Sequence, residues 1–123
     1  MSVFQKINKY PDVAVITNAY IKIQIPMIDQ DGNPIPLASS SRFGCTIEGL
    51  GNSGATASID IQGVIDGSVP AGNVMIIHLE GTYTNGFSDV ALIYCPYAII
   101  ESRIIRPGFG RLFVFSAGKP AGT

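Results

Sequence analysis

The densest group of charged side chains in this sequence contains Glu101, Arg103, Arg106 and Arg111, with Phe109 between the last two arginines. Arginine presents a planar fork of donors that matches carboxylate and phosphate groups, and arginine with aromatic residues is typical of protein interfaces. The segment is therefore a candidate for binding the acidic groups of a partner. Solvent-facing strand ends explain the same residues without any ligand, and the sequence leaves both interpretations open.

Residues Gly49 to Gly54 match the dinucleotide-binding pattern G-x-G-x-x-G letter for letter. That chemistry needs a helix directly after the glycines, because the N-terminus of the helix binds the pyrophosphate. The residues that follow, 55–61, alternate between polar and apolar side chains as a strand does. We therefore interpret the segment as a loop between strands.

The stretch from Asp29 to Asn33 places oxygen-bearing side chains at alternate positions, as calcium-binding loops do. Gly32 comes too early for an EF-hand, and Ser40 stands where the bidentate glutamate is needed. A surface turn is the preferred interpretation.

One histidine and two cysteines cannot build a four-ligand zinc site, so we predict no metal and no other cofactor. His78 lies within an apolar run and is interpreted as structural, on a sheet face or facing a neighbour. The alternatives for Cys45 and Cys95 are a disulfide that closes a long loop and two free thiols, and we expect free thiols, as in a reducing compartment. No group of residues has the arrangement of a catalytic site, and we expect a non-enzymatic protein.

The elements that must position these residues are strands, because apolar residues recur with a period of two and glycine or proline interrupts the chain about every ten residues. Segments 20–25 and 57–62 alternate and predict half-buried strands. Segments 74–79, 90–95 and 111–115 are apolar at nearly every position, which predicts cover on both faces, by the core and by a neighbouring subunit. Further strands are expected at 13–17, at 43–48, and at 98–105 after a break at Pro96.

These patterns predict an all-β fold: one domain over residues 1–123, an antiparallel β-sandwich or jelly-roll-like barrel of about seven to nine strands. Extended arms are expected at residues 1–12 and 116–123.

Only 14% of the residues are charged while 46% are hydrophobic, and the formal net charge is -1. This balance argues against nucleic acid or an anionic membrane as the main partner. The start of the chain lacks the apolar core of a signal peptide, and the longest apolar stretch, 13–28, is too short and too polar to span a bilayer. Thin charge cover predicts that partner subunits bury part of the surface.

In composition, size and turn style the whole chain resembles small β-rich virion proteins of tailed bacteriophages, in particular capsid decoration (cement) proteins. The resemblance implies a homo-oligomer that binds the major capsid protein or another virion protein, in a particle assembled in the host cytoplasm. A tail or collar component fits the composition equally. Because terminal arms and strand-end loops hold the capsid in such proteins, the implied partner-binding residues are Lys6, Lys9, Arg103, Arg106, Phe109, Arg111 and Lys119.

An alternative function from a different class is a carbohydrate- or ligand-binding β-sandwich module, for example in a receptor-binding or adhesion protein. Four aromatic residues are candidates for a sugar-binding platform: Tyr83, Phe87, Tyr94 and Tyr97. An enzyme of the jelly-roll type needs clustered histidines for its usual metal, and this sequence has one histidine.

Overall fold

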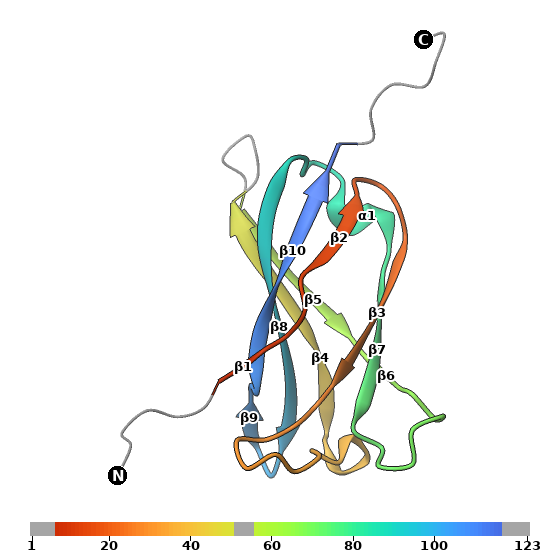
Figure 1. Ribbon diagram of the computed structural model, residues 1–123, viewed down its shortest axis with the longest axis vertical. Coiled ribbons are helices and arrows are strands. Elements are labelled where there is room, and N and C mark those ends of the chain that lie inside the picture. Colours follow the sequence, from red (N-terminus) through yellow and green to blue (C-terminus); the bar gives the residue numbers. More distant parts are fainter. Residues whose placement is uncertain (1–6, 51–55, 117–123) are drawn as a thin grey trace, which may run out of the picture.

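The structure, a computed structural model, describes residues 7–50 and 56–116. Within these ranges ten strands form two sheets that do not close into a barrel (Figure 1), and the predicted all-β sandwich is confirmed. The strands are β1 (Asn8–Lys9), β2 (Val13–Ile16), β3 (Ile21–Pro26), β4 (Arg42–Leu50), β5 (Thr56–Gln62), β6 (Val64–Ile65), β7 (Val74–Leu79), β8 (Val90–Ile100), β9 (Arg103–Ile105) and β10 (Gly108–Phe115). A 3-10 turn, η1 (Leu37–Ser39), and one helical turn, α1 (Gly81–Thr84), complete the described elements.

The larger sheet has seven strands in the order β1-β10-β8-β4-β5, with β2 also paired to β10 and β9 also paired to β8. Most pairs are antiparallel, as predicted, but β1 and β2 both run parallel to β10. The first strands of the described chain therefore lie beside its last strand (Figure 1).

The smaller sheet has three strands in the order β3-β7-β6 and is antiparallel throughout. The chain passes from the larger sheet to the smaller one between β5 and β6, where only Gly63 separates the two strands. A side chain at Gly63 would contact the sulfur of Met75 and the ring of Phe43, so a glycine suits this crossing.

The core lies between the two sheets and is filled by alternate residues of their strands. From β3 and β7 it receives isoleucine, methionine and leucine side chains, and from the larger sheet it receives Ile47, Leu92, Tyr94, Leu112 and Val114. The alternation in 20–25 and 57–62 is confirmed, because Lys22, Gln24, Ser58, Asp60 and Gln62 are all exposed.

In the three uniformly apolar strands, one face lines the core, as predicted, and the second face, which was expected to contact a neighbouring subunit, is partly or largely exposed in the described chain. In β8 the side chains of Leu92 and Tyr94 are buried, whereas Ile93 is 45% exposed. In β10 Val114 is buried and Phe115 is 49% exposed. The outward residues of these strands therefore form an apolar outer surface.

Pro96 does not break β8, contrary to the prediction of a separate strand at 98–105. Along β8, the pairing with β10 ends at Tyr94 and the pairing with β9 begins at Ala98, so Pro96 lies where neither neighbour pairs on that side. A proline lacks the N–H of a sheet ladder and is tolerated at such a gap. The chain instead reverses at Glu101 and Ser102, both in the left-handed region with φ of 52° and 62°.

Candidate functional site

The partner-binding residues predicted from the sequence lie in several parts of the structure. Lys6 and Lys119 lie outside the described residues. Lys9 is exposed on β1 and pairs in register with Phe109 of β10. Arg106 and Phe109 both line a cleft between the turn at residues 29–31 and the segment that joins β9 to β10.

Two of the predicted arginines lie away from this cleft. Arg103 is exposed in β9, directly after the turn. Arg111 is exposed on β10, in register with Ile93 of β8. The structure therefore does not bring the three arginines of this segment together.

The cleft has a volume of about 480 Å³ and lies between the turn at residues 29–31 and the segment that joins β9 to β10. Ile105, Pro107 and Phe109 give it an apolar wall, while two aspartates and Arg106 bring charges to it. The remaining lining residues are Ile7, Gln30, Cys95 and Gly108.

The acidic side of the cleft is shaped by a hydrogen-bonded turn. Asp29 Oδ1 accepts hydrogen bonds of 2.9 Å from the backbone N–H groups of both Asp31 and Asn33. Gly32, with φ of 85°, supplies the left-handed residue that the reversal needs. The predicted surface turn is confirmed.

Strand β1 is attached to the sandwich beside this cleft. The Asn8 side chain donates a 2.9 Å hydrogen bond to the carbonyl oxygen of Ile28, and the Tyr10 hydroxyl donates one of 2.9 Å to that of Pro26. Tyr10 is buried. Of the expected N-terminal arm, the described residues from Asn8 to Tyr10 thus belong to the sandwich.

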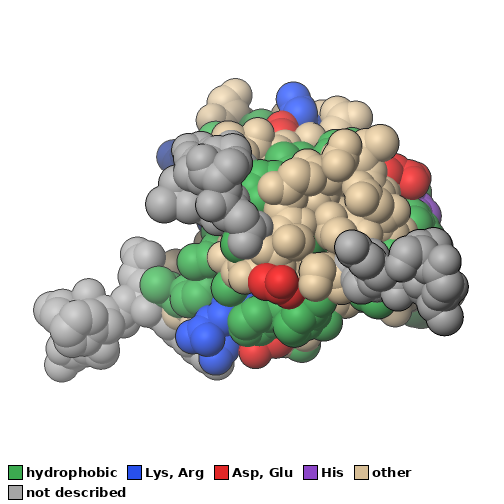
Figure 2. Space-filling view, turned by 90° about the horizontal axis from the view of Figure 1, so that it is seen from above, with side chains coloured by type: hydrophobic (Ala, Val, Ile, Leu, Met, Phe, Trp, Pro, Cys, Tyr) green, Lys and Arg blue, Asp and Glu red, His purple; other side chains and the backbone are tan. Residues whose placement is uncertain are grey.

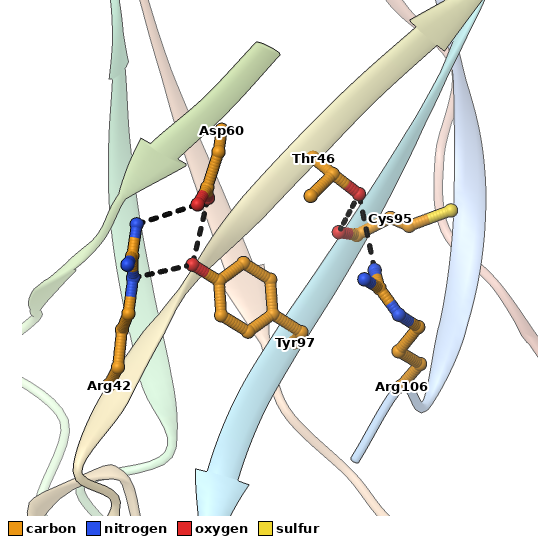
Figure 3. A network of polar contacts seen from close by, with 6 residues as sticks. All are labelled: Arg42, Thr46, Asp60, Cys95, Tyr97 and Arg106. Atoms are coloured by element: carbon orange, nitrogen blue, oxygen red, sulfur yellow. Dashed lines mark hydrogen bonds and ion pairs between the residues drawn. The ribbon is translucent and has the colours of Figure 1, made fainter. Parts of the chain in front are cut away.

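Arg106 is held by two contacts on the outer face of the larger sheet, although it is exposed. Its Nη1 donates a 3.1 Å hydrogen bond to Thr46 Oγ1, and its guanidinium carbon lies 5.5 Å from the centroid of the Tyr97 ring (Figure 3). A cation over an aromatic face is attracted by the negative charge of that face. The guanidinium is therefore positioned before any partner binds.

A polar network adjoins Arg106, and sequence reasoning did not find it. Arg42 Nη2 forms an ion pair of 2.6 Å with Asp60 Oδ2, and Arg42 Nε donates to the Tyr97 hydroxyl at 3.0 Å (Figure 3). That hydroxyl donates in turn to Asp60 Oδ1 at 2.8 Å. Burial, followed by the effect of Asp60, raises the pKa of Tyr97.

The alternation of β5 did indicate that Asp60 points outward. Its partners come from other strands, so only the strand register could join them. A small hollow of about 180 Å³ lies over this network and includes Arg106 in its lining.

The two cysteines are free, as predicted, and the register explains why. Cys45 pairs with Pro96 and faces the core, whereas Cys95 pairs with Thr46 on the outer face. Neighbouring strands thus direct the two thiols to opposite sides of one sheet. Burial raises the pKa of Cys45 to about 12, and burial also raises the pKa of Cys95.

The four aromatic residues proposed as a sugar-binding platform do not form one. Tyr94 and Phe87 are buried in the core, while Tyr97 faces the opposite side of β8 under Arg106. His78 is exposed on the outer face of β7, with Nδ1 at 2.5 Å from the Tyr20 hydroxyl oxygen, so its place on a sheet face agrees with the sequence.

Most of the glycine-rich segment lies outside the described residues. Gly49 belongs to β4 and Thr56 begins β5, its antiparallel partner. A strand and not a helix follows the segment, as the sequence indicated.

The outer face of the larger sheet carries apolar side chains at its β2, β10 and β8 strands. Ile16 is 51% exposed beside Phe115, its partner in register, and the rings of Phe113 and Phe115 stack at 6.4 Å. Ile93 continues this apolar surface on β8. Figure 2 shows hydrophobic side chains at the surface of one end of the sandwich, next to isolated charged side chains.

Among the residues that the structure describes, no group of three or more His, Cys, Asp or Glu side chains is placed to hold a metal ion. No helix in that part of the chain is long and apolar enough to cross a membrane. No protein-family model matches this chain, and no curated protein matches it.

Proposed function

We propose that this chain is a non-enzymatic structural subunit of a viral particle, a decoration protein that binds the capsid lattice of a tailed bacteriophage. The observation that carries the proposal is the apolar outer face of the larger sheet. Residues such as Ile16, Ile93 and Phe115 remain exposed there although the core is complete without them.

Exposed apolar surface of this kind favours association. Removing apolar area from water stabilises by about 25 cal/mol per Å², and contiguous apolar patches on soluble domains mark interaction surfaces. The low charge of the chain supports the same conclusion, since a net charge of -1 gives little repulsion between subunits.

The cleft beside Arg106 is the second surface that we expect to bind the capsid. Its wall at Ile105, Pro107 and Phe109 suits an apolar side chain of the capsid protein, and Arg106 suits a carboxylate beside that side chain. Arg106 is already positioned by Thr46 and Tyr97, which reduces the entropy lost on binding.

Co-sedimentation with purified phage capsids tests this proposal. Wild-type protein is expected to sediment with capsids, and a Phe109→Ser variant is expected to bind more weakly while its thermal unfolding is unchanged. Val64→Ser is the matched control, because Val64 is an exposed apolar residue of β6 in the other sheet. Failure of the wild-type protein to bind capsids, tails or any other virion fraction contradicts the proposal.

A second candidate, a ligand-binding module, is supported by the size of the cleft. Its volume of about 480 Å³ falls within the range of small-molecule sites, roughly 300–1,000 Å³. Aspartate and arginine side chains beside an aromatic ring are groups that bind sugar hydroxyls. A glycan-array screen followed by NMR titration separates the two proposed functions. If the chain is a ligand-binding module, adding the glycan shifts the backbone amide signals of Asp31, Arg106 and Phe109.

A further inference from the structure

We propose that the outer face of the larger sheet binds a second copy of this chain through a self-complementary row formed by Glu48, Ile93 and Arg111. The inference rests on the proposed function, because it names the contact by which such a subunit associates with itself.

The row runs straight across three neighbouring strands. Glu48 of β4 pairs in register with Ile93 of β8, and Ile93 pairs with Arg111 of β10. Residues in register across a sheet point to the same face, and all three are exposed. Since neighbouring strands lie about 4.8 Å apart, the row places one negative and one positive group on opposite sides of an exposed isoleucine.

Neither charge is neutralised within the described part of the chain. The ion pair found there joins Arg42 to Asp60, and no hydrogen bond between described residues involves the side chain of Glu48 or Arg111. Ile93, between them, is 45% exposed. The row thus has an apolar centre and two free, opposite charges.

A twofold axis close to the direction of β8 makes this row complementary to itself. When a second copy is turned by half a revolution about that axis and placed face to face, the two sides of the row exchange. Ile93 then lies against Ile93 of the second copy, and Glu48 faces Arg111 of the second copy. The same contact is repeated in reverse, as in isologous dimers, and facing sheets commonly pack with their strands nearly aligned.

The residues beside the row suit such a contact. Phe113 and Ala91 pair in register on the same face, one step along the strands from Arg111 and Ile93. The small Ala91 leaves room for an approaching side chain, and the Phe113 ring adds apolar area. Apolar residues therefore adjoin the charged row, and interface centres are typically apolar.

The charge pattern favours a second copy over a strongly charged partner. The row carries one charge of each sign. A basic partner surface would be repelled by Arg111, and an acidic one would be repelled by Glu48. The rotated copy meets only opposite charges, and charge complementarity of this kind determines which surfaces pair.

Light scattering and sedimentation equilibrium of the purified 123-residue chain test the inference. Wild type is expected to have twice the 13.0 kDa mass of one chain. Glu48→Arg alone places two arginines together at both contacts, because the new side chain faces Arg111 of the second copy. Arg111→Glu alone places two glutamates together. Each variant is expected to raise the dimer Kd by about 100-fold, because like charges at an interface cost several kcal/mol.

Mixing the two variants provides the decisive measurement. In the mixed dimer one chain carries two arginines and the other two glutamates, so both contacts again join opposite charges. The 1:1 mixture is expected to recover the wild-type dimer mass. An effect within one chain cannot produce this recovery, because each variant alone keeps its like charges.

Arg103→Glu and Glu80→Arg are the matched controls, since they reverse exposed charges away from the row and are expected to remain dimers. Circular dichroism of each variant checks folding, and if a reversal fails to fold, Glu48→Gln and Arg111→Gln are expected to raise the dimer Kd several-fold.

A monomeric wild type overturns the inference, as does a dimer that survives both single reversals or a mixture that stays monomeric. Capsid binding is read separately: a dimer of this kind that binds no virion fraction contradicts the proposed function alone, and a monomer that binds capsids contradicts this inference alone.

Discussion

The phenol ring of Tyr94 lies against the backbone of Gly110, its partner in register across β8 and β10. The Tyr94 hydroxyl donates a 2.5 Å hydrogen bond to the carbonyl oxygen of Pro11, just before β2. One side chain thus joins the middle of the larger sheet to the segment between β1 and β2. The ring can reach that carbonyl because Gly110 has no side chain in its path.

Replacing Gly110 by alanine is expected to destabilise the fold, because the new methyl group would collide with the Tyr94 ring. Overpacking of this kind costs about 1–3 kcal/mol in free energy of unfolding, measured by urea denaturation. Gly67→Ala is the control, because a methyl group there meets open space. Equal stability of the two variants would contradict the contact between Tyr94 and Gly110.

Ile61→Asp is expected to prevent folding, because Ile61 is buried between the sheets and an unpaired charge there lacks any compensating partner. Gln62→Asp on the same strand is expected to change the free energy of unfolding by less than about 0.5 kcal/mol, as for most surface substitutions. Circular dichroism and NMR of both proteins make the comparison. A folded Ile61→Asp variant would show that this face of β5 is not in the core.

The two thiols are expected to differ in their reaction with iodoacetamide. Cys45 is fully buried and its pKa is raised to about 12, so it should react only after unfolding. Cys95 is partly exposed, and burial raises its pKa. It should therefore react in the folded protein, but more slowly than a cysteine in an unfolded peptide. Mass spectrometry counts one label in the native protein and two in denaturant, and two native labels would contradict the placement of Cys45.

Asp66 is expected to contribute to the acid dependence of stability. Ser68 donates to Asp66 Oδ1 through its hydroxyl at 2.6 Å and its backbone N–H at 3.0 Å, and Gln24 donates to Oδ2 at 3.0 Å. These hydrogen bonds, led by those from Ser68, lower the pKa of Asp66 from its usual 3.8. The folded state therefore holds its proton less tightly than the unfolded chain.

The stabilisation from Asp66 is consequently complete above the unfolded pKa and is lost as the pH falls through the lowered, folded pKa. Ser68→Ala removes the largest cause of the shift, so its free energy of unfolding should fall less steeply with acid than that of wild type. Denaturation curves across the acid range measure the two slopes. Identical slopes would show that Ser68 does not set the pKa of Asp66.

The strands were predictable because residues that face the core are apolar and alternate along the sequence with residues that face solvent. In 20–25 and 57–62 each buried isoleucine alternates with a polar residue, and the structure buries Ile23 and Ile61 as this pattern requires. In 90–95 and 111–115 the uniformly apolar pattern predicted strands but did not show which residues face the core, and Ile93 and Phe115 face outward in the described chain. An apolar residue that faces a partner and one that faces the core look alike in sequence.

The candidate site was less predictable, because it depends on pairing between distant strands. Nothing in the local sequence joins Arg42 to Asp60 and Tyr97, or Glu48 to Arg111; only the registers of β4, β5, β8 and β10 do so. The reversal at Glu101 and Ser102 could not be predicted from the sequence for a different reason, namely the residue types at the turn. Turns with two left-handed residues favour asparagine and glycine, and here glutamate and serine adopt that conformation.

The parallel pairing of β2 with β10 has a consequence for biosynthesis. Val13 and Leu112 are partners in this ladder although nearly the whole described chain separates them. While the protein is being translated, β2 must wait without its hydrogen-bonding partner until β10 has been made. Contacts this distant in sequence slow folding, and unpaired strand edges expose nascent chains to aggregation. A chaperone that shields the β2 segment during synthesis should therefore raise the yield of folded protein.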